Sequence, residues 1–191
     1  MKRLLALTTL VFAFAVTGFS QGQVDFRNSN LSGSRFVFDT DGTTKLAGAT
    51  FSAQLYFSTT GVNGSYSAVA DPVVPFRAVG AGDGFWNPGA SNTRDLVGTL
   101  GSQSVFLQVR VWTAADGATY AIAAAKPGAK IGSSTSFAYT LGGSDGVNPP
   151  TTAGPMNGFT SFSLTTVPVP EPATFALLGL GALGFALRRR K

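Results

Sequence analysis

The 191-residue sequence contains no cysteine and no histidine, and its only glutamate lies close to the C-terminus. Without cysteine there is no thiolate nucleophile and no disulfide, so an exported domain must be held together by its core alone. Without histidine the chain lacks the commonest general base, the usual zinc ligand and the Ser–His–Asp triad. We therefore expect a protein that is not an enzyme and that uses no cofactor.

Charge is also scarce in the middle of the chain, although the whole chain has a formal charge of +5 and a pI near 9.9. Residues 23–167 carry eight cationic and eight acidic side chains, so the excess of positive charge comes from the two ends. A neutral middle offers no basic patch for nucleic acid. We expect no nucleic-acid partner.

The first 22 residues have the parts of a secretory signal peptide. Lys2 and Arg3 form a positive start, residues 4–16 form an apolar stretch, and small residues follow. Cleavage after Ser20 and cleavage after Gly22 both fit this pattern. The pattern predicts Sec-type export, with residues 1–22 removed by signal peptidase.

The C-terminal end combines three features in a fixed order. The triplet Pro170, Glu171 and Pro172 is followed by an apolar segment at 173–187 and then by a cluster of cations, which are Arg188, Arg189, Arg190 and Lys191. As a helix the apolar segment reaches about 22 Å, which is short for a hydrocarbon core of about 30 Å. Thinning of the bilayer or snorkelling arginines can accommodate the difference. The cations stay on the cytoplasmic side, so the tail predicts a membrane segment that leaves the preceding chain outside.

With these features in this order, residues 168–191 resemble a PEP-CTERM sorting signal. The resemblance implies recognition by an exosortase, a membrane transpeptidase-like enzyme that cuts near the triplet and releases or transfers the protein. It also implies a Gram-negative type of envelope and a producer of extracellular polysaccharide. The chain is then expected in the inner membrane transiently, and at the cell surface or in the extracellular matrix after processing. A permanent tail anchor is the alternative.

Residues 23–167 are dominated by alternation of apolar and polar side chains. In "SVFLQVRVW" four aliphatic residues face one side, and the opposite side carries Phe106, Gln108, Arg110 and Trp112. "ATFSAQLYF" alternates in the same way, and six Asp-Gly or Asn-Gly pairs supply tight turns. Such strands bury one face in antiparallel sheets. The sequence predicts an all-β fold, an antiparallel β-sandwich of jelly-roll or immunoglobulin-like topology, with one short helix near residues 119–125.

The stretch "FVFDTDGTT" brings two carboxylates, Asp39 and Asp41, close together. Calcium prefers several oxygen ligands, so a partial calcium site is one interpretation. The EF-hand pattern requires an acidic residue at its twelfth position, which here is Thr50. A turn closed by side-chain hydrogen bonds is the favoured alternative, and we predict no metal site.

Three aromatic residues are candidates for contacts with sugars. Trp86 lies in the Gly-rich stretch "GAGDGFWNPG", which predicts a loop, while Trp112 and Tyr56 fall opposite the apolar stripes of their strands. Exposed rings can stack on the C–H faces of sugars, whereas the alternative is that the rings are buried under loops.

Two classes of function follow for residues 23–167. The first is a structural or adhesive component of the cell surface or matrix, and the alternative is a carbohydrate-binding module that recognises extracellular polysaccharide. A polysaccharide hydrolase is a less favoured reading, because it needs two carboxylates about 5–10 Å apart. The eight aspartates of this region fall mostly in predicted turns.

Overall fold

The structure, a computed structural model, describes residues 21–170 except for 32, 34, 62–64 and 71–72. The signal peptide up to residue 20 lies outside the described residues. The same holds for most of the predicted tail, namely Glu171, Pro172, the segment 173–187 and the cations Arg188, Arg189, Arg190 and Lys191. Within the described part, no helix is long and apolar enough to cross a membrane.

Strands dominate the described residues, as the alternation predicts, and the all-β fold class is confirmed. The strands are β1 (Gly22–Asp25), β2 (Val37–Phe38), β3 (Phe51–Ser58), β4 (Ser67–Ala68), β5 (Val74–Pro75), β6 (Thr93–Leu96), β7 (Ser104–Thr113), β8 (Lys130–Ser133), β9 (Phe137–Thr140), β10 (Gly142–Gly143), β11 (Phe162–Ser163) and β12 (Thr165–Thr166). The 3₁₀ helix η1 (Ala114–Asp116) and the helix α2 (Tyr120–Ala124) follow β7.

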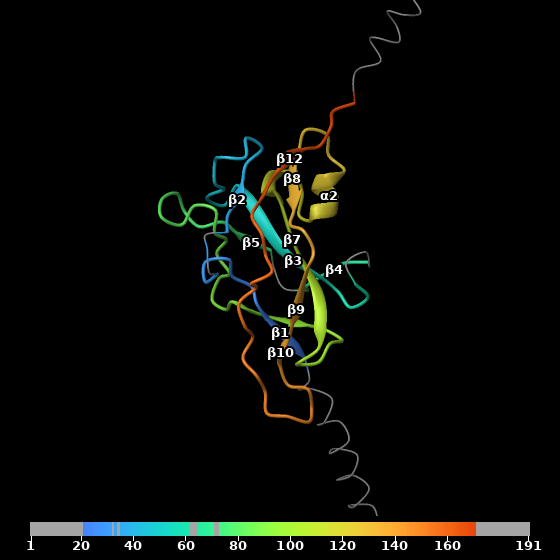
Figure 1. The fold of residues 1–191 in the computed structure, drawn as a ribbon. Helices are drawn as coiled ribbons and strands as arrows, with labels where there is room; N and C mark the ends of the chain where they lie inside the picture. Colours follow the sequence, from blue (N-terminus) through green and yellow to red (C-terminus); the bar gives the residue numbers. More distant parts are fainter. Residues whose placement is uncertain (1–20, 32, 34, 62–64, 71–72, 171–191) are drawn as a thin grey trace, which may run out of the picture.

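The largest sheet has β3 and β7 at its centre (Figure 1). These two strands are antiparallel, with Phe51 opposite Thr113 and Ser58 opposite Phe106. Strands β8 and β9 pair with the other edge of β7, β12 pairs with β8, and β4 and β5 pair with β3. Two smaller sheets, β10-β1-β6 and β11-β2, complete the arrangement.

The central strands bury one face, as the alternation predicts. The aliphatic stripe of β7, which is Val105, Leu107, Val109 and Val111, is 0% exposed. Ala53 and Leu55 of β3 join the same core, and the smaller sheets contribute Val24, Leu96 and Val37. Burial of this apolar area is the main stabilising term for a domain without disulfides.

One strand pair departs from the antiparallel prediction. Strands β2 and β11 are parallel, with Val37 opposite Phe162. A tight hairpin enforces antiparallel pairing, but a long stretch of chain separates these two strands and leaves their direction unconstrained. The choice between jelly-roll and immunoglobulin-like topology stays a prediction.

The expected helix near residues 119–125 is present as α2. Thr119 caps its N-terminus, because its Oγ1 accepts a hydrogen bond from the backbone N–H of Ile122 at 3.4 Å. The helix ends before the Pro127-Gly128 pair, and Gly128 has a φ of +84° that favours glycine.

The two ends of the described chain lie at opposite ends of the molecule (Figure 1). Strand β1 begins at Gly22, one residue before the predicted boundary of the central domain, and its N–H donates to the backbone oxygen of Thr99 at 3.1 Å. A Cβ at Gly22 would lie 2.3 Å from Leu141, so this glycine is tightly packed. Of the two predicted cleavage positions, the one after Ser20 keeps β1 whole.

Candidate functional site

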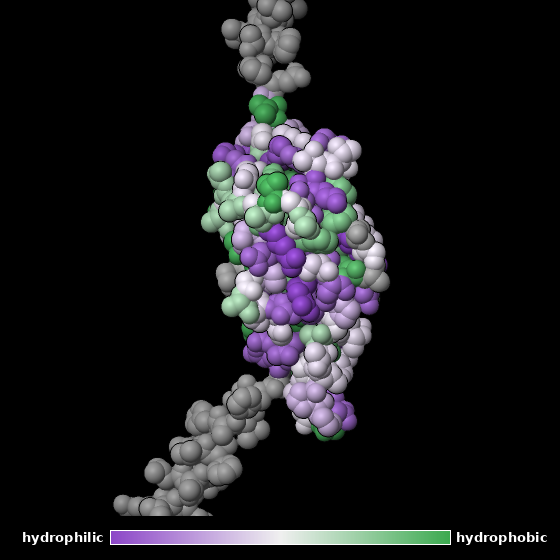
Figure 2. Space-filling model, turned by 90° about the vertical axis from the view of Figure 1, so that its left-hand side faces the viewer, coloured by the Kyte–Doolittle hydropathy of each residue, from purple (hydrophilic) through white to green (hydrophobic). Residues whose placement is uncertain are grey.

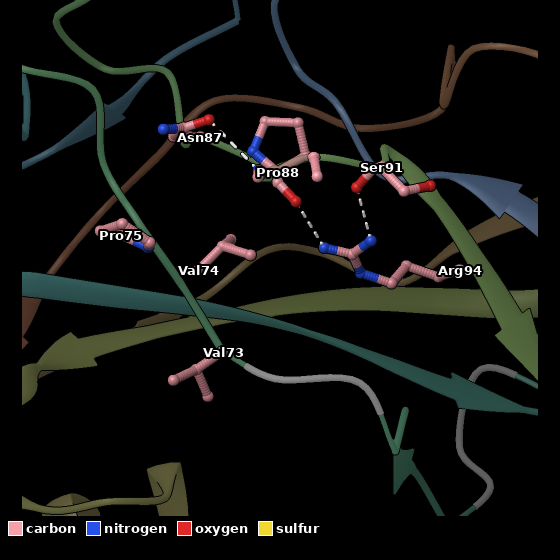
Figure 3. A pocket seen from close by; sticks show the side chains of 9 residues that line it. Val73, Val74, Pro75, Asn87, Pro88, Ser91 and Arg94 are labelled. Carbon is pink, nitrogen blue, oxygen red and sulfur yellow. Dashed lines mark hydrogen bonds between the residues drawn. The ribbon is translucent and has the colours of Figure 1, made fainter.

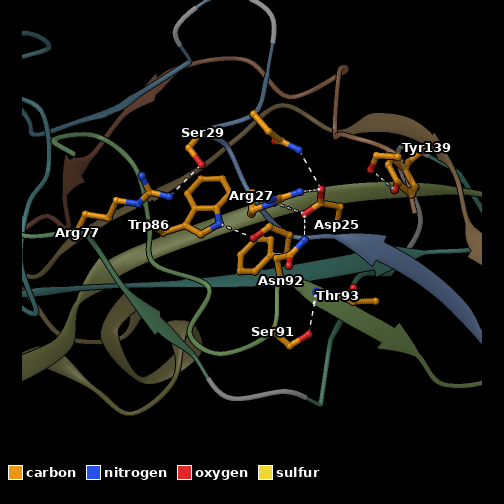
Figure 4. Close-up of polar contacts among 12 residues, drawn as sticks. Asp25, Arg27, Ser29, Arg77, Trp86, Ser91, Asn92, Thr93 and Tyr139 are labelled. Atoms are coloured by element: carbon orange, nitrogen blue, oxygen red, sulfur yellow. Dashed lines mark hydrogen bonds and ion pairs between the residues drawn. The ribbon is translucent and has the colours of Figure 1, made fainter. Parts of the chain in front are cut away.

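Trp86, the first of the predicted sugar-binding rings, lies in the core. Its side chain is 0% exposed, and its ring centroid lies 5.0 Å from that of Phe26 and 5.4 Å from that of Phe159. The indole Nε1 donates a hydrogen bond to the backbone oxygen of Phe26 at 3.0 Å (Figure 4). A ring enclosed in this way presents no face to a sugar in this structure, which agrees with the alternative that the ring is buried. The neighbouring Phe85 is the half-buried ring of this segment.

Trp112 and Tyr56 occupy the sheet face that the alternation predicts, but they are covered there. The chain after β7 folds back over Trp112, whose Nε1 donates to the backbone oxygen of Gly117 at 2.7 Å and whose side chain is 0% exposed. Tyr56 is 7% exposed, and the guanidinium carbon of Arg110 lies 4.1 Å from its ring centroid. These two rings are therefore buried as well, as the alternative to a sugar contact expects.

Arg110 is one of the residues on this face that are only half-buried. We define the outer face as the side chains of β3 and β7 that point away from the core, namely Ser52, Gln54, Tyr56, Ser58, Phe106, Gln108, Arg110 and Trp112. The guanidinium carbon of Arg110 lies near two tyrosine rings, 4.1 Å from the ring centroid of Tyr56 and 5.2 Å from that of Tyr120 in α2. Its Nε donates to Oε1 of Gln108 at 2.8 Å.

A third tyrosine lies across the outer face. Tyr66 precedes β4 at one edge of the large sheet, and its hydroxyl is hydrogen-bonded to Oγ of Ser136, which lies between β8 and β9 beyond β7. Two of the tyrosines, Tyr56 and Tyr120, thus lie near Arg110, and Tyr66 joins the two edges of the sheet. The alternation of apolar and polar residues is enough to place Tyr56 and Arg110 on the outer face. Tyr66 and Tyr120 come from segments whose sequence gives no indication that they lie near this face.

The electrostatics of the outer face are dominated by Arg110. Burial raises the pKa of the Tyr56 hydroxyl, while the positive charge of Arg110 acts in the opposite direction. The net effect keeps Tyr56 neutral at pH 7, so it does not neutralise the arginine. Among the described residues, no carboxylate pairs with Arg110; the ion pairs found there join other cations, Arg27 to Asp25, Lys126 to Asp116 and Lys130 to Asp39.

A pocket of about 430 Å³ opens elsewhere, between β5 and the loop before β6 (Figure 3). Arg94 lies at its wall and is 6% exposed. The guanidinium donates to the backbone oxygens of Ser91 at 2.8 Å and Pro88 at 2.9 Å, so it holds the loop closed on itself. The arginine has a structural role in this pocket.

A buried polar cluster surrounds Asp25 at the end of β1 (Figure 4). Arg27 donates to both carboxylate oxygens, at 2.7 and 2.5 Å, and the amides of Asn30 and Asn92 donate at 2.9 and 2.7 Å. Burial alone would raise the pKa of Asp25, but the hydrogen bonds and the positive charge of Arg27 outweigh this and lower it. The carboxylate is therefore ionised and fully used in holding β1 to its neighbours.

Asp39 and Asp41 form a turn rather than a shared cation site. The carboxylate of Asp41 accepts hydrogen bonds from the hydroxyl of Thr44 and from the N–H groups of Thr43 and Thr44, which lower its pKa. Asp39 accepts from Nζ of Lys130 at 2.7 and 2.8 Å. The two carboxylates thus serve a turn and an ion pair, and no group of three or more potential metal ligands occurs among the described residues.

The described part of the tail is short and exposed. After β12 the backbone of Val167 exchanges hydrogen bonds with Gly128 and Ala129, at 2.9 and 2.8 Å. Pro168, Val169 and Pro170 are then all exposed, and Pro170 is the last described residue. The described chain leaves at one end of the domain (Figure 1 and Figure 2). The tail therefore leaves the domain beside the segment that follows α2.

Comparison with known protein families matches residues 168–191 to the PEP-CTERM protein-sorting motif. No curated protein and no solved structure matches the chain. The match confirms the resemblance drawn from the triplet, the apolar segment and the cation cluster. The chain carries an exosortase-type sorting tail, which supports export, association of the tail with the membrane before processing, and cleavage by an exosortase.

Proposed function

We propose that this chain is a non-enzymatic structural or adhesive protein of the cell surface or extracellular matrix. The sorting motif at residues 168–191 is the observation that carries the proposal, because it supports export and processing of whatever precedes it. Residues 21–170 then supply the cargo, a β-rich domain whose core is a cluster of aliphatic and aromatic side chains.

The use of the aspartates supports a role without catalysis. A hydrolase needs carboxylates that are free to exchange protons with a substrate. Each aspartate of the described residues instead accepts a hydrogen bond within the domain, and these residues are Asp25, Asp39, Asp41, Asp83, Asp95, Asp116 and Asp145. Most of these bonds close turns or hold an ion pair. They give the carboxylates a structural use.

The proposal includes a route for the chain. Signal peptidase removes the N-terminal segment after Sec-type export, and the tail holds the chain in the inner membrane until an exosortase cuts near Pro170. The domain then reaches the surface or the matrix, where polysaccharide is its expected neighbour.

Mass spectrometry of the C-terminus in each cell fraction tests this route. We expect the surface form to end near the triplet, and the Glu171→Gln variant to accumulate uncut in the inner membrane. Pro149→Ala, which changes an exposed proline of the domain, serves as the control and is expected to be processed normally. Recovery of an intact "FALRRRK" terminus in every fraction would show that the tail is a permanent anchor.

A further inference from the structure

We propose that the outer face of the large sheet, centred on Arg110, binds the carboxylate groups of an acidic polysaccharide. This inference rests on the proposed function, because it takes the partner to be a polymer outside the cell. It names the binding residue that the aromatic prediction missed.

The first argument is charge. Nε of Arg110 donates to Gln108, and the guanidinium also interacts with the hydroxyl of Tyr56, but no carboxylate among the described residues accepts from its terminal Nη atoms. No buried side-chain nitrogen or oxygen of the described residues lacks a hydrogen bond, so Nη donors that have no partner in the domain are accessible to an external acceptor. An arginine whose charge no neighbouring carboxylate balances is complementary to an external anion.

The second argument is preorganisation. Gln108 accepts a hydrogen bond from Nε of Arg110, and the rings of Tyr56 and Tyr120 both pack near the guanidinium. This leaves the pair of Nη donors in a fixed fork, whose geometry matches the two oxygens of a carboxylate. Less side-chain entropy is then lost on binding than for a freely rotating arginine.

The third argument is the shape and polarity of the surroundings. Arg110 lies in register with Gln54 of β3 and with the exposed Ser133 of β8. Small exposed side chains, Ala68 and Ala138, continue this open surface on β4 and β9. An acidic peptide usually needs an apolar pocket for an anchoring side chain, whereas the side chains next to Arg110 on this face are the half-buried amides of Gln54 and Gln108 and the exposed hydroxyl of Ser133. Such a surface fits an extended chain that carries many hydroxyls and one carboxylate per repeat.

The test measures binding of the full-length chain, in a neutral detergent, to polygalacturonate and to the same polymer after reduction of its carboxylates to alcohols. We expect saturable binding to polygalacturonate and at least tenfold weaker binding to the reduced polymer. Arg110→Gln is expected to weaken binding to polygalacturonate at least tenfold. Arg77→Gln is the matched control, because Arg77 also lies over an aromatic ring, Phe85, but on another part of the surface.

Each other outcome overturns the proposal. If polygalacturonate and the reduced polymer bind equally tightly, the carboxylate has no role in binding. If the Arg110→Gln variant binds polygalacturonate as tightly as the wild type, Arg110 has no role. If poly-glutamate binds as tightly as polygalacturonate, the site is one for acidic protein segments. If Arg110→Gln does not fold, Tyr120→Ala takes its place as the test variant, because it removes one of the two tyrosine rings near Arg110 at a half-buried position of α2. Unchanged binding of polygalacturonate by Tyr120→Ala would also contradict the proposal. If the protein is processed and sorted normally but fails these binding tests, only the binding site at Arg110 is contradicted. If the tail is not processed, the proposed function is contradicted.

Discussion

The two faces of the large sheet are built from the same strands, yet they differ in almost every physical respect. Alternate residues of β7 form an aliphatic stripe that is 0% exposed on one side and a polar, aromatic surface around Arg110 on the other. The inner face is held by its contacts with strands and loops from the rest of the domain. The outer face is covered only in part, by η1, α2 and Tyr66. The pleat of a single strand therefore separates the buried core from the surface that we propose for recognition.

Adjacent residues of β7 give the largest expected contrast. Leu107→Ala leaves a cavity in the inner face and is expected to lower the free energy of unfolding by about 2–5 kcal/mol. Gln108→Ala, one position along the same strand, removes a half-buried amide of the outer face and is expected to cost about 1 kcal/mol. Chemical denaturation of the full-length chain measures both values. Equal losses would mean that the outer face is as tightly packed as the inner one.

Asp25 tests whether a buried charge can matter as much as the aliphatic core. Asp25→Asn weakens the contact with Arg27 and is expected to cost about 1.5–3 kcal/mol at pH 7. Because the pKa of Asp25 is lowered by folding, its contribution is present above the ordinary pKa of about 4 and is lost as pH falls through the folded value. The variant should therefore lose less stability than the wild type on acidification below about pH 4. Asp95→Asn, an exposed carboxylate with one hydrogen bond from Gln23, is the control.

The expected change in stability at Arg110 is as small as that at Gln108. Arg110→Gln removes two contacts with tyrosine rings at a half-buried position, and is expected to lower the free energy of unfolding by about 1 kcal/mol. The same variant is expected to lose most binding to an acidic polymer. A loss of stability as large as that of Leu107→Ala would make Arg110 a packing residue and would contradict the separation of the two faces.

The sequence allowed the two faces to be predicted because alternation is a local property of a strand. Val109 and Arg110 could be assigned to opposite sides from their neighbours alone. The segments that cover each face of the sheet could not be predicted, because they reach it through contacts that no local sequence pattern specifies. Phe159 encloses Trp86, and the chain after β7 encloses Trp112. The parallel pairing of β2 and β11 was also missed, since it has no local signature.

The candidate site was predicted only in part, for the same reason. Composition drew attention to the tryptophans, which are the largest rings and therefore the ones most useful to the core. The local pattern placed Arg110 on the open side, but a lone arginine in a strand gives no sign of the two tyrosines that hold it. The tail is the opposite case, because its triplet, apolar segment and cations are contiguous in the sequence and were recognised in full.

The hydrogen bonds at the exit of the tail have a mechanical consequence. The chain leaves the domain from β12, which is bonded to β8, and β8 is bonded to β7, the strand that carries Arg110. Tension between a tethered C-terminus and a polymer held at Arg110 would therefore pass through three neighbouring strands of one sheet. The backbone ladders would share this load, and the core beneath them would resist the sliding of one strand past the next.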